Sequence, residues 1–229
     1  MAITNPFRAT AIFLIEIFYD QLWGFKPNIV RPVVAQKGAV RSLFWFARNS
    51  LKYASTLEQW GPLRTHLLTT SISAINGCPY SVFGQAFALQ LTYLKQTGNL
   101  LPLTEREMMA LCGQEEAQVL STLEQSLSQT SLTSEILSLQ RMSELRHNPT
   151  LATTEQDHQL IHLIQMFATL NTCGMRNNLP TDQAHASINK NRAMRDRYIA
   201  LREAERAQPK AAQPAGVTVL HPADIAADF

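Results

Sequence analysis

The chain is poor in charge and in long apolar runs, and each shortage excludes a class of function. Charged residues make up 17% of the 229 residues, below the roughly 25% of an average soluble domain. The formal net charge is only +2 and no aromatic-basic RNA-binding motif is present, so we expect no nucleic-acid partner. Residues 11–15 are apolar, but Glu16 and Asp20 interrupt the run. It falls short of the roughly 20 residues that span a bilayer, so we expect no membrane span.

Cysteine is also scarce. Cys78, Cys112 and Cys173 form neither a CxxC pair nor a Cys/His spacing typical of metal sites. His158 and His162 are four residues apart, but no HExxH glutamate or third ligand lies near them. We therefore expect no metal and no cofactor. An odd number of cysteines, with no small-residue cleavage site of the secretory kind, predicts a reducing, cytoplasmic location.

The low charge content predicts that part of the surface is covered, most simply by oligomerisation. Residues 1–100 hold 9 Lys and Arg against 3 Asp and Glu, a net charge of +6, whereas residues 101–229 hold 11 against 15, a net charge of −4. This asymmetry is typical of complementary packing between halves or subunits. A basic surface for an anionic ligand is the alternative.

Helical periodicity dominates the sequence and no segment alternates like a strand, so we predict an all-α fold. We expect one domain over residues 1–207, and a disordered tail over 208–229, which is rich in Pro and Ala. Thr104 and Glu107 fit a capping box. The expected helices cover residues 6–24, 39–54, 62–75, 79–96, 105–111, 115–128, 134–146 and 157–172, with a charged C-terminal arm from 181 or 182 to 207.

The helix at 6–24 is an extra N-terminal helix, and it is apolar around almost its whole circumference. Asn5 is expected to cap it. Such a helix is buried or lies in an interface. Burial in a subunit interface is the favoured interpretation, and burial within the monomer or contact with a membrane are the alternatives. The C-terminal arm has only a thin apolar stripe, which predicts a surface helix or an arm lying on a neighbour.

The most informative segment is residues 76–85, Asn-Gly-Cys-Pro-Tyr-Ser-Val-Phe-Gly-Gln. Asn-Gly marks a tight turn, and Pro79 suits the first position of a helix. Cys78 would then cap the helix, where the dipole and unpaired backbone N–H groups favour the thiolate. Ser81 and Gln85 follow at spacings that place them on the same helix face as Cys78.

This segment resembles the alkylhydroperoxidase-D-like (AhpD-like) / carboxymuconolactone decarboxylase family. Its redox-active members carry Asn-Gly-Cys-x-x-Cys-x-x-x-His, with a glutamate twelve residues before the first cysteine. Cys78 matches that cysteine, but Ser81, Gln85 and His66 stand in place of the second cysteine, the histidine and the glutamate. The resemblance covers residues 60–112. It implies an AhpD-like helical domain that forms a trimer or hexamer, without the two-cysteine peroxidase reaction, because serine cannot resolve a mixed disulfide.

The helix before the motif carries a polar stripe that begins at His66. The resemblance implies that this stripe faces the motif helix across a buried gap. Because buried polar groups need partners, the pattern predicts either a satisfied network or a small-molecule pocket. The candidate binding residues are Ser81, Gln85, Thr69, Thr70 and Ser73.

We therefore expect a diverged family member, a pseudoenzyme in the peroxidase sense, that binds or processes a small organic molecule in a polar pocket at the 63–96 hairpin. One alternative is an oligomeric interaction protein with a vestigial pocket. Another is a one-thiol enzyme with Cys78 as nucleophile and His66 as base. A third is decarboxylase-like chemistry with His66 as acid or base and Arg64 or Gln85 as a ligand contact.

Overall fold

A computed structural model describes residues 6–207, and every regular element in that range is helical, which confirms the predicted all-α fold. The tail over 208–229 and the Asn5 cap lie outside the described residues. The elements are α1 (Pro6–Trp23), α2 (Val30–Lys37), α3 (Ala39–Trp60), α4 (Pro62–Ile75), α5 (Pro79–Thr97), α6 (Glu105–Met109), α7 (Glu116–Ser128), η1 (Thr133–Glu135), α8 (Ile136–His147), η2 (Pro149–Leu151), α9 (Glu155–Arg176), η3 (Ser187–Lys190) and α10 (Arg192–Ala207).

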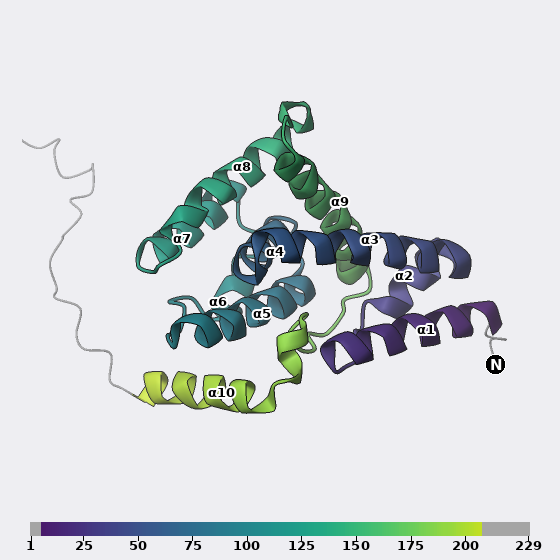
Figure 1. Cartoon of the computed structure of the whole chain (residues 1–229), viewed down its shortest axis with the longest axis horizontal. Coiled ribbons are helices and arrows are strands. Elements are labelled where there is room, and N and C mark those ends of the chain that lie inside the picture. The colour runs from purple at the N-terminus through teal and green to yellow at the C-terminus, as the bar shows by residue number, and fades with distance from the viewer. Residues whose placement is uncertain (1–5, 208–229) are drawn as a thin grey trace, which may run out of the picture.

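The α4–α5 hairpin lies at the centre of the molecule (Figure 1). Pro62 and Pro79 occupy the first positions of the two helices, where a missing N–H costs nothing. Gly77 makes the turn with a positive φ of 75°. Every residue from Thr65 to Ala74 is buried, so α4 is enclosed on all sides, and α3, α7, α8 and α9 pack around it.

Capping boxes fix the start of two helices in this shell. At α6, Thr104 Oγ1 accepts from the backbone of Glu107, whose carboxylate accepts from the Thr104 N–H, as the sequence predicts. At α9, Thr154 and Asp157 form the same reciprocal pair. Each box satisfies backbone donors that the first turn of a helix leaves free.

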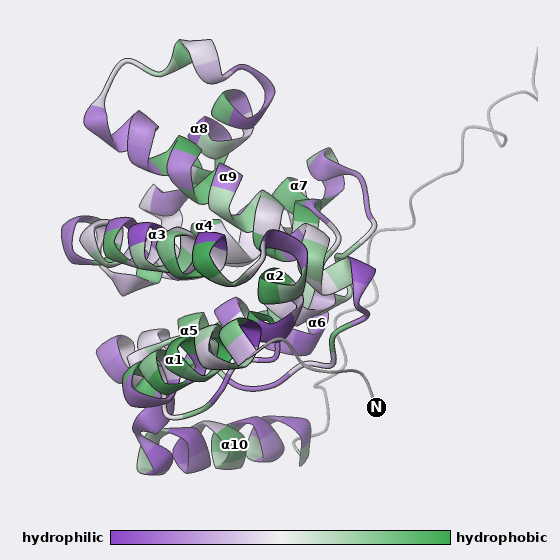
Figure 2. Ribbon diagram, turned by 90° about the vertical axis from the view of Figure 1, so that its right-hand side faces the viewer, coloured by the Kyte–Doolittle hydropathy of each residue, from purple (hydrophilic) through white to green (hydrophobic). Residues whose placement is uncertain are grey.

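α1 is buried on one face only. Ala11, Ile15 and Tyr19 pack against α2 and α3, whereas Leu14 and Phe18 on the other face are about half exposed. Figure 2 shows hydrophobic residues on both α1 and α3. Burial of the exposed face of α1 in a subunit interface stays a prediction.

The structure corrects two element predictions. Residues 30–37 form α2, a helix absent from the expected set. Pro32 is compatible with it because it lies in the first turn, where no intrahelical N–H bond is needed. The C-terminal arm becomes helical at Arg192, not at 181 or 182. Residues 181–186 instead lie against α5 and the end of α1, where Asp182 and His185 make tertiary hydrogen bonds.

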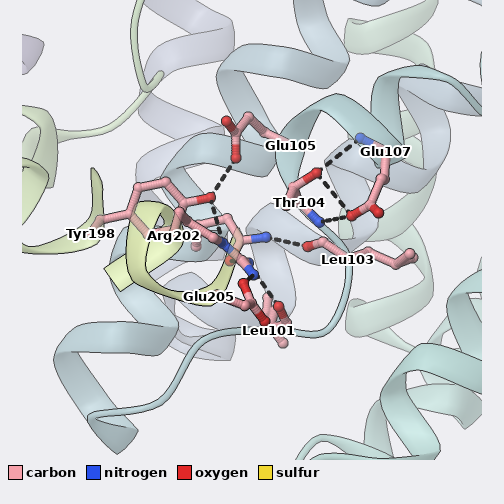
Figure 3. Close-up of polar contacts among 9 residues, drawn as sticks. Leu101, Leu103, Thr104, Glu105, Glu107, Tyr198, Arg202 and Glu205 are labelled. Atoms are coloured by element: carbon pink, nitrogen blue, oxygen red, sulfur yellow. Dashed lines mark hydrogen bonds and ion pairs between the residues drawn. The ribbon is translucent and has the colours of Figure 1, made fainter. Parts of the chain in front are cut away.

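α10 packs on its own chain, along α5 (Figure 1). Arg202 is buried and donates to Gln90 Oε1 (3.0 Å) and to the Leu101 carbonyl (2.7 Å). Its Nε donates to Tyr198 Oη, which in turn donates to Glu105 (Figure 3). The arm is therefore a surface helix held by one buried cation, with Tyr198 in a small apolar cluster beneath it.

Candidate functional site

A pocket of about 850 Å³ opens between α1, α3 and α5 and reaches α9 and η3. This volume is within the range of small-molecule sites, roughly 300–1,000 Å³. Most of its lining is apolar. The apolar lining residues include Leu14, Ile15, Phe18, Leu22, Trp23, Ile29, Leu43, Phe46, Leu51, Leu57, Met166, Phe167 and Leu170.

One polar group in the pocket wall joins three helices. Gln85 Oε1 on α5 lies 2.9 Å from His66 Nδ1 and 3.0 Å from Thr69 Oγ1, both on α4. Tyr53 on α3 donates to the same oxygen at 3.3 Å. We call His66, Gln85 and Tyr53 the polar triad. With the amide oxygen of Gln85 as acceptor, His66 carries its proton on Nδ1, and its Nε2 is an acceptor.

Two atoms of the polar triad have no protein partner within residues 6–207. These are Nε2 of His66 and the amide nitrogen of Gln85, and both residues line the pocket. One is an acceptor and the other a donor. A hydroxyl or an amide with an N–H group on a bound molecule can pair with both, whereas a carbonyl can pair only with the Gln85 donor.

The polar triad is electrically neutral at pH 7. Burial lowers the pKa of His66 from 6.5 to about 4; the hydrogen bond with Gln85 opposes this shift and the charge of His185 adds to it. Burial also raises the pKa of Tyr53 well above its ordinary value of 10. The desolvation cost of a charge in this apolar surrounding explains both directions.

A second polar group lies at the η3 side of the pocket. His185 Nε2 donates to Asp182 Oδ1 (2.8 Å), and Tyr80 Oη donates to Asp182 Oδ2 (2.8 Å). The His185 ring stacks on Trp23, with centroids 5.3 Å apart and planes at 9°. Burial acts to raise the pKa of Asp182, but His185 and the hydrogen bonds from Asn28 and Tyr80 hold it below its ordinary value. The carboxylate is therefore fully paired.

Gly84 makes room for the His185 ring. A Cβ on Gly84 would lie 2.4 Å from Cε1 and Nδ1 of His185, far inside van der Waals contact. The backbone N–H of His185 also donates to the Gly84 carbonyl at 3.0 Å. Gly84 thus lets His185 of the C-terminal segment pack against α5.

The remaining residues predicted for the site lie apart from the polar triad. Cys78 is the N-cap residue of α5, as expected, but its thiol is completely buried and does not line the pocket. Sγ lies 3.5 Å from Ser81 Oγ, and no hydrogen bond joins it to His66 among the described residues. Ser81 lines the pocket, and all three cysteines are free thiols.

Three residues of the α4 stripe are used within the core. Thr69 bonds Gln85 directly, whereas Thr70 Oγ1 donates back to the His66 carbonyl at 2.7 Å. Ser73 pairs with Asn171 of α9. Arg64 forms a two-bond ion pair with Glu135 at 2.6 and 3.0 Å and does not reach the pocket. The stripe is therefore mainly a satisfied network with one open end at His66.

Several residues of the site carry no local signal in the sequence. Tyr53, Tyr80 and the Asp182–His185 pair reach it from three separate segments, and only the fold brings them together. Within residues 6–207, no group of three or more His, Cys, Asp or Glu side chains could hold a metal ion. No helix in that range is long and apolar enough to cross a membrane.

Searches of protein-family models, curated proteins and solved structures found no match to this chain.

Proposed function

We propose that the protein binds a small organic molecule in the α1–α3–α5 pocket, with an apolar body along α1 and α3 and one uncharged polar group at the polar triad. The observation that carries this proposal is the pairing of open His66 Nε2 and Gln85 amide nitrogen with a large apolar pocket. Ligand sites commonly combine apolar walls with a few convergent polar groups.

The charge distribution selects an uncharged polar group. The charged lining residues are Glu58 and Lys95, both exposed, and the ring of His185, which also lines the pocket, is bonded to Asp182. A carboxylate at the polar triad would be desolvated beside a neutral histidine, with no cation to pair with. A hydroxyl would satisfy both open atoms without that cost, because it donates to His66 Nε2 and accepts from the Gln85 amide nitrogen.

We also propose that the chain is a diverged relative of the AhpD-like family. The α4–α5 hairpin, the Asn76-Gly77 turn and Cys78 at the N-cap of α5 support it. The position of Cys78 does not favour a one-thiol enzyme, because a nucleophile must reach its substrate. We therefore propose a binding role for the pocket and a packing role for this thiol.

Displacement of N-phenyl-1-naphthylamine, a neutral apolar fluorophore, tests the site. Ala54 is exposed and lines the pocket, so Ala54→Trp should block the mouth and lower probe affinity by about tenfold or more. Ala200→Trp on α10 is the matched control and should bind like the wild type. Equal binding by all three proteins would show that the probe binds elsewhere.

A second arm of the experiment tests the head group. We expect 1-dodecanol to displace the probe at a concentration about thirtyfold lower than dodecanoate at pH 8, because one satisfied buried hydrogen bond and one avoided charge burial each contribute about 1 kcal/mol. His66→Phe should reduce the preference about fivefold through the lost hydrogen bond, while the charge-burial part and probe binding remain. Tighter binding of dodecanoate would contradict the proposed chemistry.

A further inference from the structure

Helices α1 and α3 pack against each other, and each exposes large apolar side chains. We define the α1–α3 outer face by six residues: Leu14, Phe18 and Leu22 on α1, and Val40, Phe44 and Leu51 on α3. Phe44 and Leu51 are 74% and 73% exposed, and Val40 is 63% exposed. Exposed apolar patches of this kind mark interaction surfaces.

The α3 part of this face is a continuous stripe. Val40, Phe44 and Leu51 follow at spacings of four and seven, which places them on one side of the helix. Phe46 and Tyr53, on the opposite side, are buried in the protein. The stripe is therefore not needed for the packing of α3 on residues 6–207.

The outer face is continuous with the pocket. Leu14, Phe18, Leu22 and Leu51 are all at least 42% exposed and also line the pocket. The same side chains thus form the rim of the mouth and part of the exposed apolar surface. A ligand that enters between α1 and α3 has to cross this surface.

Unpaired positive charge borders the stripe. Arg41, Arg48 and Lys52 are exposed on one flank of α3, and none of them forms an ion pair within residues 6–207. The acidic residue of α3 is Glu58, near its C-terminal end. Antiparallel pairing of α3 with a second copy would bring Arg48 close to Arg48 of that copy, so the charge favours an anionic occupant instead.

We infer that the α1–α3 outer face docks on an anionic lipid surface and that the pocket takes its ligand from that surface. Apolar side chains of a peripheral helix enter the headgroup boundary, while flanking Lys and Arg attract anionic headgroups. The ligand class is then an uncharged amphipathic lipid with a hydroxyl group. The ligand part rests on the proposed function, whereas the docking part stands on the exposed face alone.

Vesicle flotation of the full chain tests the docking. We expect binding to vesicles of phosphatidylcholine and phosphatidylglycerol in equal parts, and weaker binding to phosphatidylcholine alone or at high salt. Phe44→Glu should lower the bound fraction about tenfold. Leu137→Glu is the matched control, because Leu137 is 72% exposed on α8, and it should bind like the wild type.

A second pair of variants tests the basic residues beside the α3 stripe. Arg48→Glu should lower binding to the anionic vesicles by about tenfold, because each basic residue near such a surface contributes about that factor or somewhat less. Arg197→Glu on the exposed side of α10 should leave binding unchanged. Phe44 and Arg48 do not line the pocket, so both variants should still bind N-phenyl-1-naphthylamine.

Three results would overturn the inference. One is wild-type protein that stays unbound with anionic vesicles. Another is an equal loss in Phe44→Glu and Leu137→Glu. The third is a wild-type dimer in sedimentation velocity that Phe44→Glu dissociates, because a second copy would then cover the face. If vesicles bind but the fluorophore does not, docking stands and the proposed pocket function fails.

Discussion

Replacing Gly84 by Ala tests how the C-terminal segment is seated against α5. The new Cβ would lie 2.4 Å from two ring atoms of His185 and 2.5 Å from Cγ, about 1 Å closer than an ordinary contact. His185 is buried, stacked on Trp23 and bonded to Asp182, so the ring cannot move aside without losing these interactions. The methyl group must therefore displace the whole 182–186 segment.

The expected cost follows from opposing effects. Overpacking of a core costs roughly 1–3 kcal/mol, and losing the His185–Asp182 hydrogen bond costs roughly 1.5–3 kcal/mol. Alanine in place of a helical glycine raises the free energy of unfolding by about 1 kcal/mol through its higher helix propensity. We expect Gly84→Ala to lower the free energy of unfolding by about 3 kcal/mol, measured by urea denaturation followed by circular dichroism.

A double-mutant cycle identifies the cause. His185→Ala removes every ring atom that the new methyl group would meet. In that background Gly84→Ala should be neutral or stabilising by up to about 1 kcal/mol, because only the helix propensity of Ala remains. An equal destabilisation in both backgrounds would refute the packing argument, and so would a neutral Gly84→Ala in the wild type.

Three further predictions concern stability. The unfolded chain binds a proton at His66 below pH 6.5 but the folded chain only below about 4, so stability should fall as the pH drops through this window. Between pH 7 and pH 5 the wild type should lose about 2 kcal/mol more of its free energy of unfolding than His66→Gln, as measured by urea titrations at both pH values. The control His158→Gln, at an exposed histidine, should lose as much as the wild type. Thr154→Ala should lower the free energy of unfolding by about 1 kcal/mol through the lost α9 cap. Thr153→Ala should change it little, because the Thr153 hydroxyl makes no hydrogen bond in the described range. Equal urea midpoints for the two variants would contradict this prediction. Arg202→Met should lower the free energy of unfolding by about 3 kcal/mol, because Gln90 Oε1 and the Leu101 carbonyl lose their donor. A similar loss in Arg206→Met, at an exposed arginine and measured in the same way, would show that the buried network is not the cause.

The hairpin could be predicted from the sequence because its signals are local. Pro62, Pro79 and the Asn76-Gly77 turn set the ends of α4 and α5, and helical spacing places His66 and Thr69 on one face. Both bond Gln85 across the hairpin. Short-range backbone preferences were sufficient for this part.

The other half of the site depends on contacts that have no local pattern. Asp182 and His185 lie in a segment whose sequence is compatible with helix, but Asn28, Tyr80 and Gly84 hold it in an irregular path. Tyr53 has no feature that separates it from other core aromatics. The apolar character of the pocket likewise arises from packing α1 against α3, segments that no short motif connects.

The central claim is that a ligand hydroxyl bonds to Nε2 of His66 in the pocket. The most direct measurement is the ¹⁵N resonance of that nitrogen, in protein labelled at histidine and assigned with His66→Gln, during titration with 1-dodecanol. We predict that the His66 Nε2 signal shifts in proportion to site occupancy and that Ala54→Trp prevents the shift. Binding of 1-dodecanol with no change at His66 would contradict the account.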